Sequence, residues 1–153
     1  MKNKFIATTI SEYLNEQQHF IVYHGTNKLF DKFDKSKVVD GNYSDGFYFT
    51  NKIEKAKEYG SVVLKCNIFG NNVLVIDNET KTDKFINDVF KITKIKYDSN
   101  RKAWYGIRRE LKSNDFKNLL ENMGYDLIIA KTHYQIEYVL FNNKNINIIG
   151  VIS

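Results

Sequence analysis

The order of strand-like and helix-like segments most constrains how this chain can fold. Short apolar or alternating runs typical of β-strands fall at 20–26, 46–50, 61–69, 72–77, 125–131, 136–142 and 146–152. Helical periodicity or helix-ending signals fall at 4–17, 52–59, 82–95 and 113–124. Strands therefore lie on both sides of the helices, without a regular strand–helix–strand alternation. This order predicts an α+β fold with a split, mainly antiparallel β-sheet core and flanking helices.

Length and composition set the number of domains and the compartment. With 153 residues, 42% of them hydrophobic, the chain can bury one core, and we expect a single domain over 1–153. It lacks an apolar run of the roughly 20 residues that span a bilayer, and its first residues are too polar for a secretory signal. We therefore expect a cytoplasmic protein, or one delivered into a target cytoplasm, with no membrane partner. Its one cysteine, Cys66, is expected to be a packed thiol.

Positive charge is concentrated in one segment. Residues 91–112 carry a net charge of +6, which exceeds the +5 of the whole chain. Such a patch can steer an anionic partner, such as nucleic acid, a dinucleotide or an acidic protein surface. A solvated helix face with an exposed loop is the alternative. The side chains of this segment that we assign to target recognition are Arg101, Lys102, Trp104, Arg108 and Arg109.

The stretch from Gly46 to Gly60 places two tyrosines eleven residues apart on two kinds of element. Tyr48 lies in a strand-like run, and Tyr59 lies near the end of a short helix that Asn51 is expected to cap. Packing in an ordinary core would explain both rings. The alternative is that the two rings clamp a flat ligand, because aromatic faces bind planar and cationic rings by stacking and cation–π attraction.

Two further patterns place polar groups where a ligand could reach them. His24 and Gly25 end the first strand-like run, so a ring that donates and accepts hydrogen bonds stands beside backbone open to close approach. Glu137 shares one face of its strand with Val139 and Phe141. A carboxylate there costs free energy unless it is paired, at an edge or lining a cleft. An ordinary turn and a salt-bridged edge residue are the structural alternatives.

Taken in order, these patterns resemble those of the ADP-ribosyltransferases. His-Gly-Thr follows a first strand, Gly-x-Tyr-Phe-Thr precedes a second tyrosine, and Glu-Tyr-Val-x-Phe lies near the C-terminus. This is similar to the branch typified by diphtheria toxin and the poly(ADP-ribose) polymerases, whose signature is His, Tyr, Tyr, Glu. The matching segments are 20–26, 46–60 and 124–142. Small phage and bacterial members of the superfamily are the most similar.

The resemblance implies a role for each signature residue. Glu137 would be catalytic and would stabilise an oxocarbenium-like transition state at the ribose that loses nicotinamide. His24 would hydrogen-bond a ribose hydroxyl of NAD, and the backbone of Gly25 would hold the nicotinamide carboxamide. Tyr48 and Tyr59 would stack on the nicotinamide ring.

Other positions follow from the same resemblance. Thr26 and Thr50, which end the two motifs, are expected at the NAD site, and Gln135 is at most a residue that contacts the target. Ala56 replaces the serine that polymerases carry three residues before the second tyrosine, which favours single transfer over chain building. NAD is the expected co-substrate. No metal is expected, because no cluster of cysteines and histidines has ligand spacing.

The function implied is a mono-ADP-ribosyltransferase that cleaves NAD at the nicotinamide–ribose bond. It would transfer ADP-ribose to a macromolecular target, protein or nucleic acid, in the setting of a toxin, an effector or a phage protein. An NAD glycohydrolase is one alternative. A non-catalytic module of the same fold that binds NAD, ADP-ribose or RNA is another. We expect a monomer, with the target and the modified residue left open.

Overall fold

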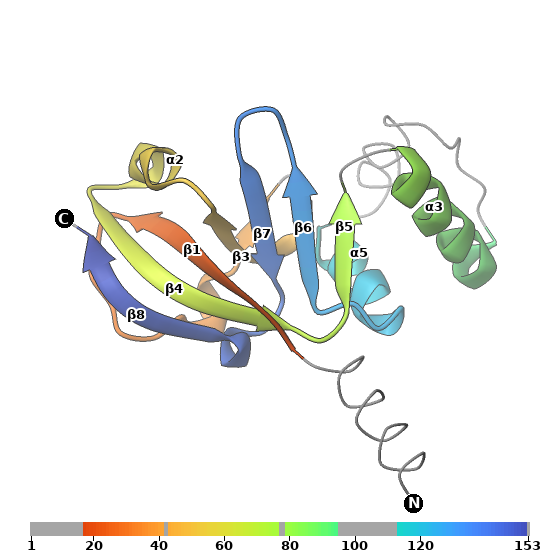
Figure 1. The fold of residues 1–153 in the computed structure, drawn as a ribbon. Coiled ribbons are helices and arrows are strands. Elements are labelled where there is room, and N and C mark those ends of the chain that lie inside the picture. Colours follow the sequence, from red (N-terminus) through yellow and green to blue (C-terminus); the bar gives the residue numbers. More distant parts are fainter. Residues whose placement is uncertain (1–16, 42, 77–78, 95–112, 153) are drawn as a thin grey trace, which may run out of the picture.

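The computed structural model describes residues 17–41, 43–76, 79–94 and 113–152 (Figure 1). Its strands are β1 (Gln18–Thr26), β2 (Val39–Asp40), β3 (Asp45–Thr50), β4 (Val62–Gly70), β5 (Val73–Ile76), β6 (Leu127–Lys131), β7 (Ile136–Leu140) and β8 (Ile146–Ile152). Its α-helices are α2 (Ile53–Ala56), α3 (Glu79–Thr93) and α5 (Ser113–Asn122). Its 3-10 helices are η1 (Lys35–Lys37), η2 (Lys57–Tyr59) and η3 (Asn143–Asn145). Apart from residue 17, which is not helical, the helix expected at 4–17 lies outside the described residues.

The seven strands expected from the sequence are all present, with ends within two residues of those expected. The helix expected at 52–59 is instead one turn of α-helix, α2, followed by the 3-10 turn η2. The segment between β1 and β3, for which no helix or strand was expected, contains the short strand β2 and the turn η1. No helix in the described ranges is long and apolar enough to cross a bilayer.

The strands form one sheet in the order β5-β6-β7-β3-β1-β4-β8, and β2 pairs with β3 beside this path. Strands β5 and β6 are parallel, whereas all other neighbours are antiparallel. The helices lie beside the sheet, with α3 and α5 on the side of β5 and β6 (Figure 1). The prediction of a mainly antiparallel α+β fold is confirmed.

The sheet curves until its two halves face each other across a core. One buried cluster joins side chains of β1 and β4 to side chains of β6 and β7, although these pairs of strands are not neighbours in the sheet. The rings of Phe20 in β1 and Tyr138 in β7 have centroids 5.3 Å apart. Cys66 is fully buried in this cluster, and burial raises the pKa of its thiol to about 12, as expected for a packed and unreactive cysteine.

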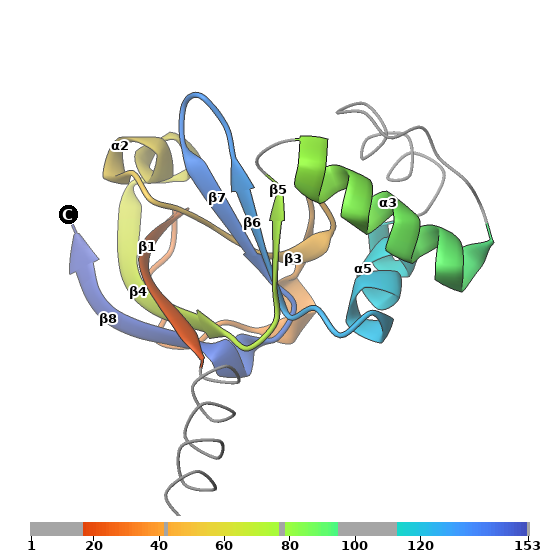
Figure 2. The same cartoon turned by 45° about the vertical axis from the view of Figure 1, so that its right-hand side comes forward.

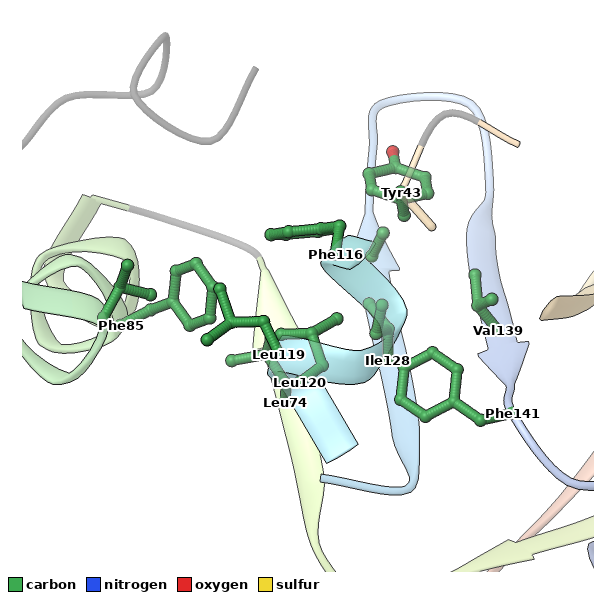
Figure 3. Close-up of a cluster of buried hydrophobic side chains, with 11 residues drawn as sticks. Tyr43, Leu74, Phe85, Phe116, Leu119, Leu120, Ile128, Val139 and Phe141 are labelled. Atoms are coloured by element: carbon green, nitrogen blue, oxygen red, sulfur yellow. The ribbon is translucent and has the colours of Figure 1, made fainter. Parts of the chain in front are cut away.

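A second cluster packs α3 and α5 against the opposite face of β5, β6 and β7 (Figures 2 and 3). Phe85 of α3 and Phe116 of α5 meet edge to face, with ring centroids 6.3 Å apart. Each such fully buried apolar side chain stabilises the fold by about 1.5–3 kcal/mol. The cluster contains Tyr43, Leu74, Phe85, Val89, Phe116, Leu119, Leu120, Ile128, Ala130, Val139 and Phe141. It therefore supports the strand that carries Glu137.

The sheet divides between β1 and β3. Strand β1 pairs with β4 along its whole length, from Gln18 to Thr26. In contrast, β1 pairs with β3 at Tyr23 and Thr50, near the end of each strand. The two halves therefore diverge from this point, which confirms the expected split and opens space between the strand ends.

The expected helix cap at Asn51 is wrong. Lys52 occupies the cap position of α2, and its side chain makes no capping hydrogen bond. Asn51 instead pairs with the start of β7: its backbone N–H donates to the Ile136 carbonyl oxygen at 3.1 Å, and its side-chain oxygen accepts from the Ile136 N–H at 2.8 Å. The pairing of β3 with β7 is thereby extended past Glu137 and fixes the backbone on its N-terminal side.

Candidate functional site

A cleft of about 650 Å³ opens where β1 and β3 diverge, within the range typical of small-molecule sites. Its walls come from β1 and the residues after it, from β3, from α2 and η2, and from the start of β7. The residues assigned from the sequence that line it are His24, Gly25, Thr26, Tyr48, Thr50, Tyr59, Gln135 and Glu137. Residues up to 114 positions apart in the chain, Tyr23 and Glu137, thus meet in one cavity.

His24 lies near the end of β1 and spans the division in the sheet. Its Nδ1 is 2.8 Å from the carbonyl oxygen of Tyr48, and because a carbonyl only accepts, Nδ1 carries the proton and donates. The other ring nitrogen, Nε2, is then an acceptor. Burial lowers the pKa of His24 and outweighs this hydrogen bond, which raises it. The ring is therefore neutral at neutral pH and packs edge-on against Phe33, with centroids 4.9 Å apart.

Gly25 holds β1 directly against α2. A Cβ at this position would overlap the carbonyl oxygen of Ala56 and crowd the Cβ of Tyr59. Any larger residue would therefore push β1 away from α2 and η2. The glycine gives the cleft a wall made of bare backbone, which a ligand can approach closely.

Tyr48 is anchored at the tip of its side chain. Its hydroxyl accepts from the backbone N–H groups of Tyr43 and Ser44, both at 3.1 Å, and donates to the Ser44 carbonyl oxygen at 2.6 Å. Gly41 lies so close that a Cβ there would overlap the Tyr48 ring. The ring is therefore held in one orientation and forms a fixed wall of the cleft.

Tyr59 lies at the opposite rim of the cleft, where its side chain is more exposed and less restrained than that of Tyr48. It is the last residue of η2, and its side chain is 63% exposed. Its hydroxyl makes no hydrogen bond with the described part of the chain. Only its attachment beside Gly25 directs it towards the cleft. Its ring is thus free to adjust to a ligand.

Glu137 enters the cleft from β7, between two neighbouring strands. It is paired with Thr50 of β3 and with Ala130 of β6, so its backbone is fixed on both sides. Burial raises the pKa of its carboxyl group, and a hydrogen bond from the side chain of Tyr43 opposes that shift. Within the described ranges Glu137 has no ion-pair partner. A half-buried carboxylate without a cation is poised to stabilise positive charge on a ligand.

The remaining assigned residues take part in hydrogen bonds with residues two or three positions away in the chain, which stabilise the walls of the cleft. Thr50 is 5% exposed, and its hydroxyl accepts from the backbone N–H two residues on, at 3.2 Å. The hydroxyl of Thr26 bonds to the backbone of Lys28. Gln135 is held by Thr132, whose backbone N–H and hydroxyl both donate to its carbonyl oxygen at 3.0 Å. The side chain of Gln135 therefore reaches the cleft from a closed turn.

Two residues of the site were not singled out from the sequence. Tyr43, whose side chain lowers the pKa of Glu137 against the effect of burial, falls between the strands expected at 20–26 and 46–50, where an aromatic among polar residues is the one sequence signal. Lys28 is the one cation that lines the cleft among the described residues. The residues assigned to target recognition lie outside the described residues: Arg101, Lys102, Trp104, Arg108 and Arg109. In the described ranges no cluster of histidine, cysteine and acidic side chains could hold a metal ion.

Comparisons with known proteins bear on the whole domain. A sequence model of the family "ADP-Ribosyltransferase in polyvalent proteins" matches residues 15–150. The crystal structure of an anti-CRISPR protein is similar at a TM-score of 0.43 and 14% identity, over 86% of this chain and 96% of that chain. None of the curated proteins matches the sequence. Because the family model matches residues 15–150, nearly the whole chain, the chain belongs to the ADP-ribosyltransferase family found in polyvalent proteins.

Proposed function

We propose that the protein is a mono-ADP-ribosyltransferase that cleaves NAD and transfers ADP-ribose to a protein or nucleic-acid target. The observation that carries the proposal is the meeting of Glu137, two tyrosines and the His24–Gly25 pair in one cleft. The family match is independent of this geometry and supports the same reaction class.

NAD would be held by its nicotinamide end. The rings of Tyr48 and Tyr59 would stack on the nicotinamide, which is flat and cationic in NAD. The bare backbone at Gly25 would hydrogen-bond the carboxamide. Nε2 of His24, an acceptor in the tautomer described above, would accept from a ribose hydroxyl. Lys28 would face the pyrophosphate, since it brings positive charge to the cleft lining.

The chemistry would begin with breakage of the bond between ribose C1′ and the nicotinamide nitrogen. The bonding electron pair stays with nitrogen, so nicotinamide leaves neutral and positive charge develops on the ribose. The carboxylate of Glu137 would stabilise this oxocarbenium-like charge. A nucleophile of the target would then bond to C1′ and lose its proton, with Glu137 placed to polarise it.

A module that only binds NAD has no use for this carboxylate. Burial of Glu137 raises the pKa of its carboxyl group, so keeping it ionised costs free energy in the folded protein. Stacking and hydrogen bonding could hold NAD without it. The presence of a costly, unpaired acid in the cleft therefore favours catalysis over binding alone.

The test follows both ends of NAD. Purified protein would be incubated with a cell lysate and NAD labelled either in nicotinamide or in adenine. Release of free nicotinamide measures cleavage, and adenine label in macromolecules measures transfer; protease or nuclease digestion then identifies the target class. Cleavage without macromolecular label would indicate a glycohydrolase. Neither event, with NAD binding intact, would leave a binding module and reject the proposal.

A further inference from the structure

Strand β8 forms one edge of the sheet (Figure 1). It pairs with β4, and in the described part of the chain its backbone makes no hydrogen bond to any other segment. Its sequence, INIIGVI, has neither a charged residue nor a proline, the residue types that commonly protect an edge strand from further pairing. The strand therefore offers a row of backbone donors and acceptors to another extended chain.

A cavity of about 500 Å³ lies beside this edge. It is lined by Ile146 and Ile148 of β8, by Asn143 and Lys144 of η3, and by residues of the segment 31–35. No residue of β1 or β4 lines the cavity, so it lies on the free side of β8. It also has no lining residue in common with the cleft between β1 and β3. The cavity is therefore a separate candidate site.

The walls of the cavity are fixed by hydrogen bonds from asparagine and aspartate side chains. The side-chain nitrogen of Asn143 donates to the carbonyl oxygen of Phe33 at 2.9 Å, which joins residues 110 positions apart in the chain. Asp34 caps η1 by accepting from the backbone N–H and the hydroxyl of the residue two positions on, at 2.9 and 2.8 Å. Asn142 caps η3 by accepting from the Lys144 N–H at 2.9 Å. The backbone that carries the charged side chains of the cavity is thus ordered before a partner binds.

The charge of the cavity lining is positive. Lys32, Lys35 and Lys144 are exposed and line it, against one acid, Asp31. None of the three lysines forms an ion pair within the described ranges. The two isoleucines of β8 that line the cavity pack against the core cluster and give it an apolar side. A partner that fills the cavity should therefore present carboxylates together with aliphatic groups.

We propose that the free edge of β8 and the cavity beside it bind an extended, acidic segment of a partner protein by β-strand addition. Strands in a sheet lie about 4.8 Å apart, so a strand added to β8 brings its side chains beside those of β8. Alternate side chains of the segment would enter the cavity next to Ile146 and Ile148, and acidic ones would meet the lysines. The inference goes beyond the proposed function, because it requires neither NAD nor Glu137.

Two other occupants fit this surface less well. A second copy of β8 would bring no carboxylate to the lysines, because the strand has no acidic residue. A nucleic acid would supply negative charge, but its phosphates cannot donate hydrogen bonds to the carbonyl groups of the edge. An acidic peptide satisfies both the backbone of β8 and the lysines.

The main experiment measures binding of a fluorescein-labelled peptide slightly longer than β8, with glutamate and valine at alternating positions. Fluorescence anisotropy gives its Kd, and hydrogen exchange followed by NMR reports on the β8 amides. We expect binding that weakens with added salt, and slower exchange of the β8 amides that point away from β4. The same peptide with methylated backbone nitrogens keeps its charge, loses its donors and should not bind. Unprotected β8 amides, or equal binding of the methylated peptide, would overturn the proposal.

The lysines are tested by a matched pair of charge reversals. Lys35→Glu combined with Lys144→Glu should weaken peptide binding about tenfold, as expected when two exposed attractions become repulsions. The control is Lys84→Glu combined with Lys91→Glu, which changes the net charge equally on α3, on the other side of the molecule (Figure 1). The control should leave the Kd unchanged. Equal weakening in both variants would mean that net charge alone attracts the peptide, and the proposal would fail.

Two further measurements test the other occupants. If the chain alone sediments as a dimer whose β8 amides are already protected, a second copy occupies the edge and the proposal is wrong. It is also wrong if a single-stranded oligonucleotide of equal charge binds more tightly than the peptide and the Lys35→Glu, Lys144→Glu variant loses that binding. NAD cleavage by this variant should equal that of the wild type, because the two cavities share no lining residue.

Discussion

The two tyrosines of the cleft are alike in the sequence and unlike in the structure. Tyr48 is half-buried on a central strand, and three hydrogen bonds hold its hydroxyl. Tyr59 ends a single 3-10 turn, is 63% exposed, and has no hydrogen bond to its hydroxyl within the described ranges. One ring belongs to the fixed inner wall, which also carries Glu137; the other belongs to the open rim.

This difference predicts whether a substitution at each tyrosine changes ligand affinity alone or ligand affinity together with protein stability. A substitution at Tyr59 should change only ligand binding, because the exposed ring packs little against the rest of the protein. Substituting Tyr48 should affect ligand binding and also the β2–β3 turn, because the Tyr48 hydroxyl bonds to the backbone of Tyr43 and Ser44. Ligand affinity and protein stability should therefore separate at the rim and change together at the inner wall.

The largest effect is expected from removing the charge of the inner wall. Glu137→Gln should lower kcat for NAD cleavage by roughly two to four orders of magnitude, the range for groups that stabilise transition-state charge, with the Kd for NAD nearly unchanged. Steady-state kinetics and calorimetric NAD binding on the same preparation measure both. A folded variant that turns over at the wild-type rate would remove Glu137 from the chemistry.

Removing one oxygen atom from each ring sharpens the comparison. Tyr48→Phe removes the acceptor that the Tyr43 and Ser44 N–H groups share and one of the two donors to the Ser44 carbonyl oxygen, and should lower the free energy of unfolding by about 1–3 kcal/mol. Tyr59→Phe should stay within about 0.5 kcal/mol of wild type. Chemical denaturation gives both values. Equal losses in the two variants would mean that the hydrogen bonds of the Tyr48 hydroxyl do not stabilise the fold.

Removing the rim ring isolates stacking. Tyr59→Ala should weaken NAD binding by about 1 kcal/mol, or roughly fivefold in Kd. The melting temperature should remain at the wild-type value, because the side chain is exposed. If affinity is kept and the melting temperature falls, the ring packs in the fold and does not clamp a ligand.

The smallest effect is a gain in stability from the variant that loses activity. Burial raises the folded-state pKa of Glu137 above its ordinary value of 4.5, so ionising it costs free energy once the pH exceeds that value. Glu137→Gln should therefore melt at a higher temperature than wild type at neutral pH. Below pH 4.5 the carboxyl group is protonated in both states, and the two proteins should melt together. A constant difference across pH would point to packing.

Local patterns in the sequence were enough to place the seven expected strands to within two residues of their ends. Strand β8 begins and ends where its apolar alternation predicts. Gly25, Tyr48 and Tyr59 of the sequence motifs all line the cleft. These features depend on neighbouring residues, which a single sequence displays. The assignment of roles at His24, Gly25 and Glu137 came from resemblance and stays a prediction.

Features set by distant partners could not be predicted in the same way. Asn51 has the residue type of a helix cap, yet its side chain bonds to Ile136, 85 residues away. Tyr43 stands among polar residues, and only the curvature of the chain buries it beside Val139. The parallel pairing of β5 with β6 likewise depends on a connection that no local periodicity encodes.

The hydrogen bond between His24 and the Tyr48 carbonyl also sets what an inhibitor should look like. Because Nδ1 is occupied as a donor, His24 offers a ligand a lone pair, and Glu137 offers another acceptor nearby. A compound for this cleft should therefore be a flat ring bearing donors at both edges, sized to lie between the two tyrosines. Compounds that present carbonyl or sulfonyl oxygens to His24 should bind poorly, and methylation of a donor nitrogen should abolish the fit.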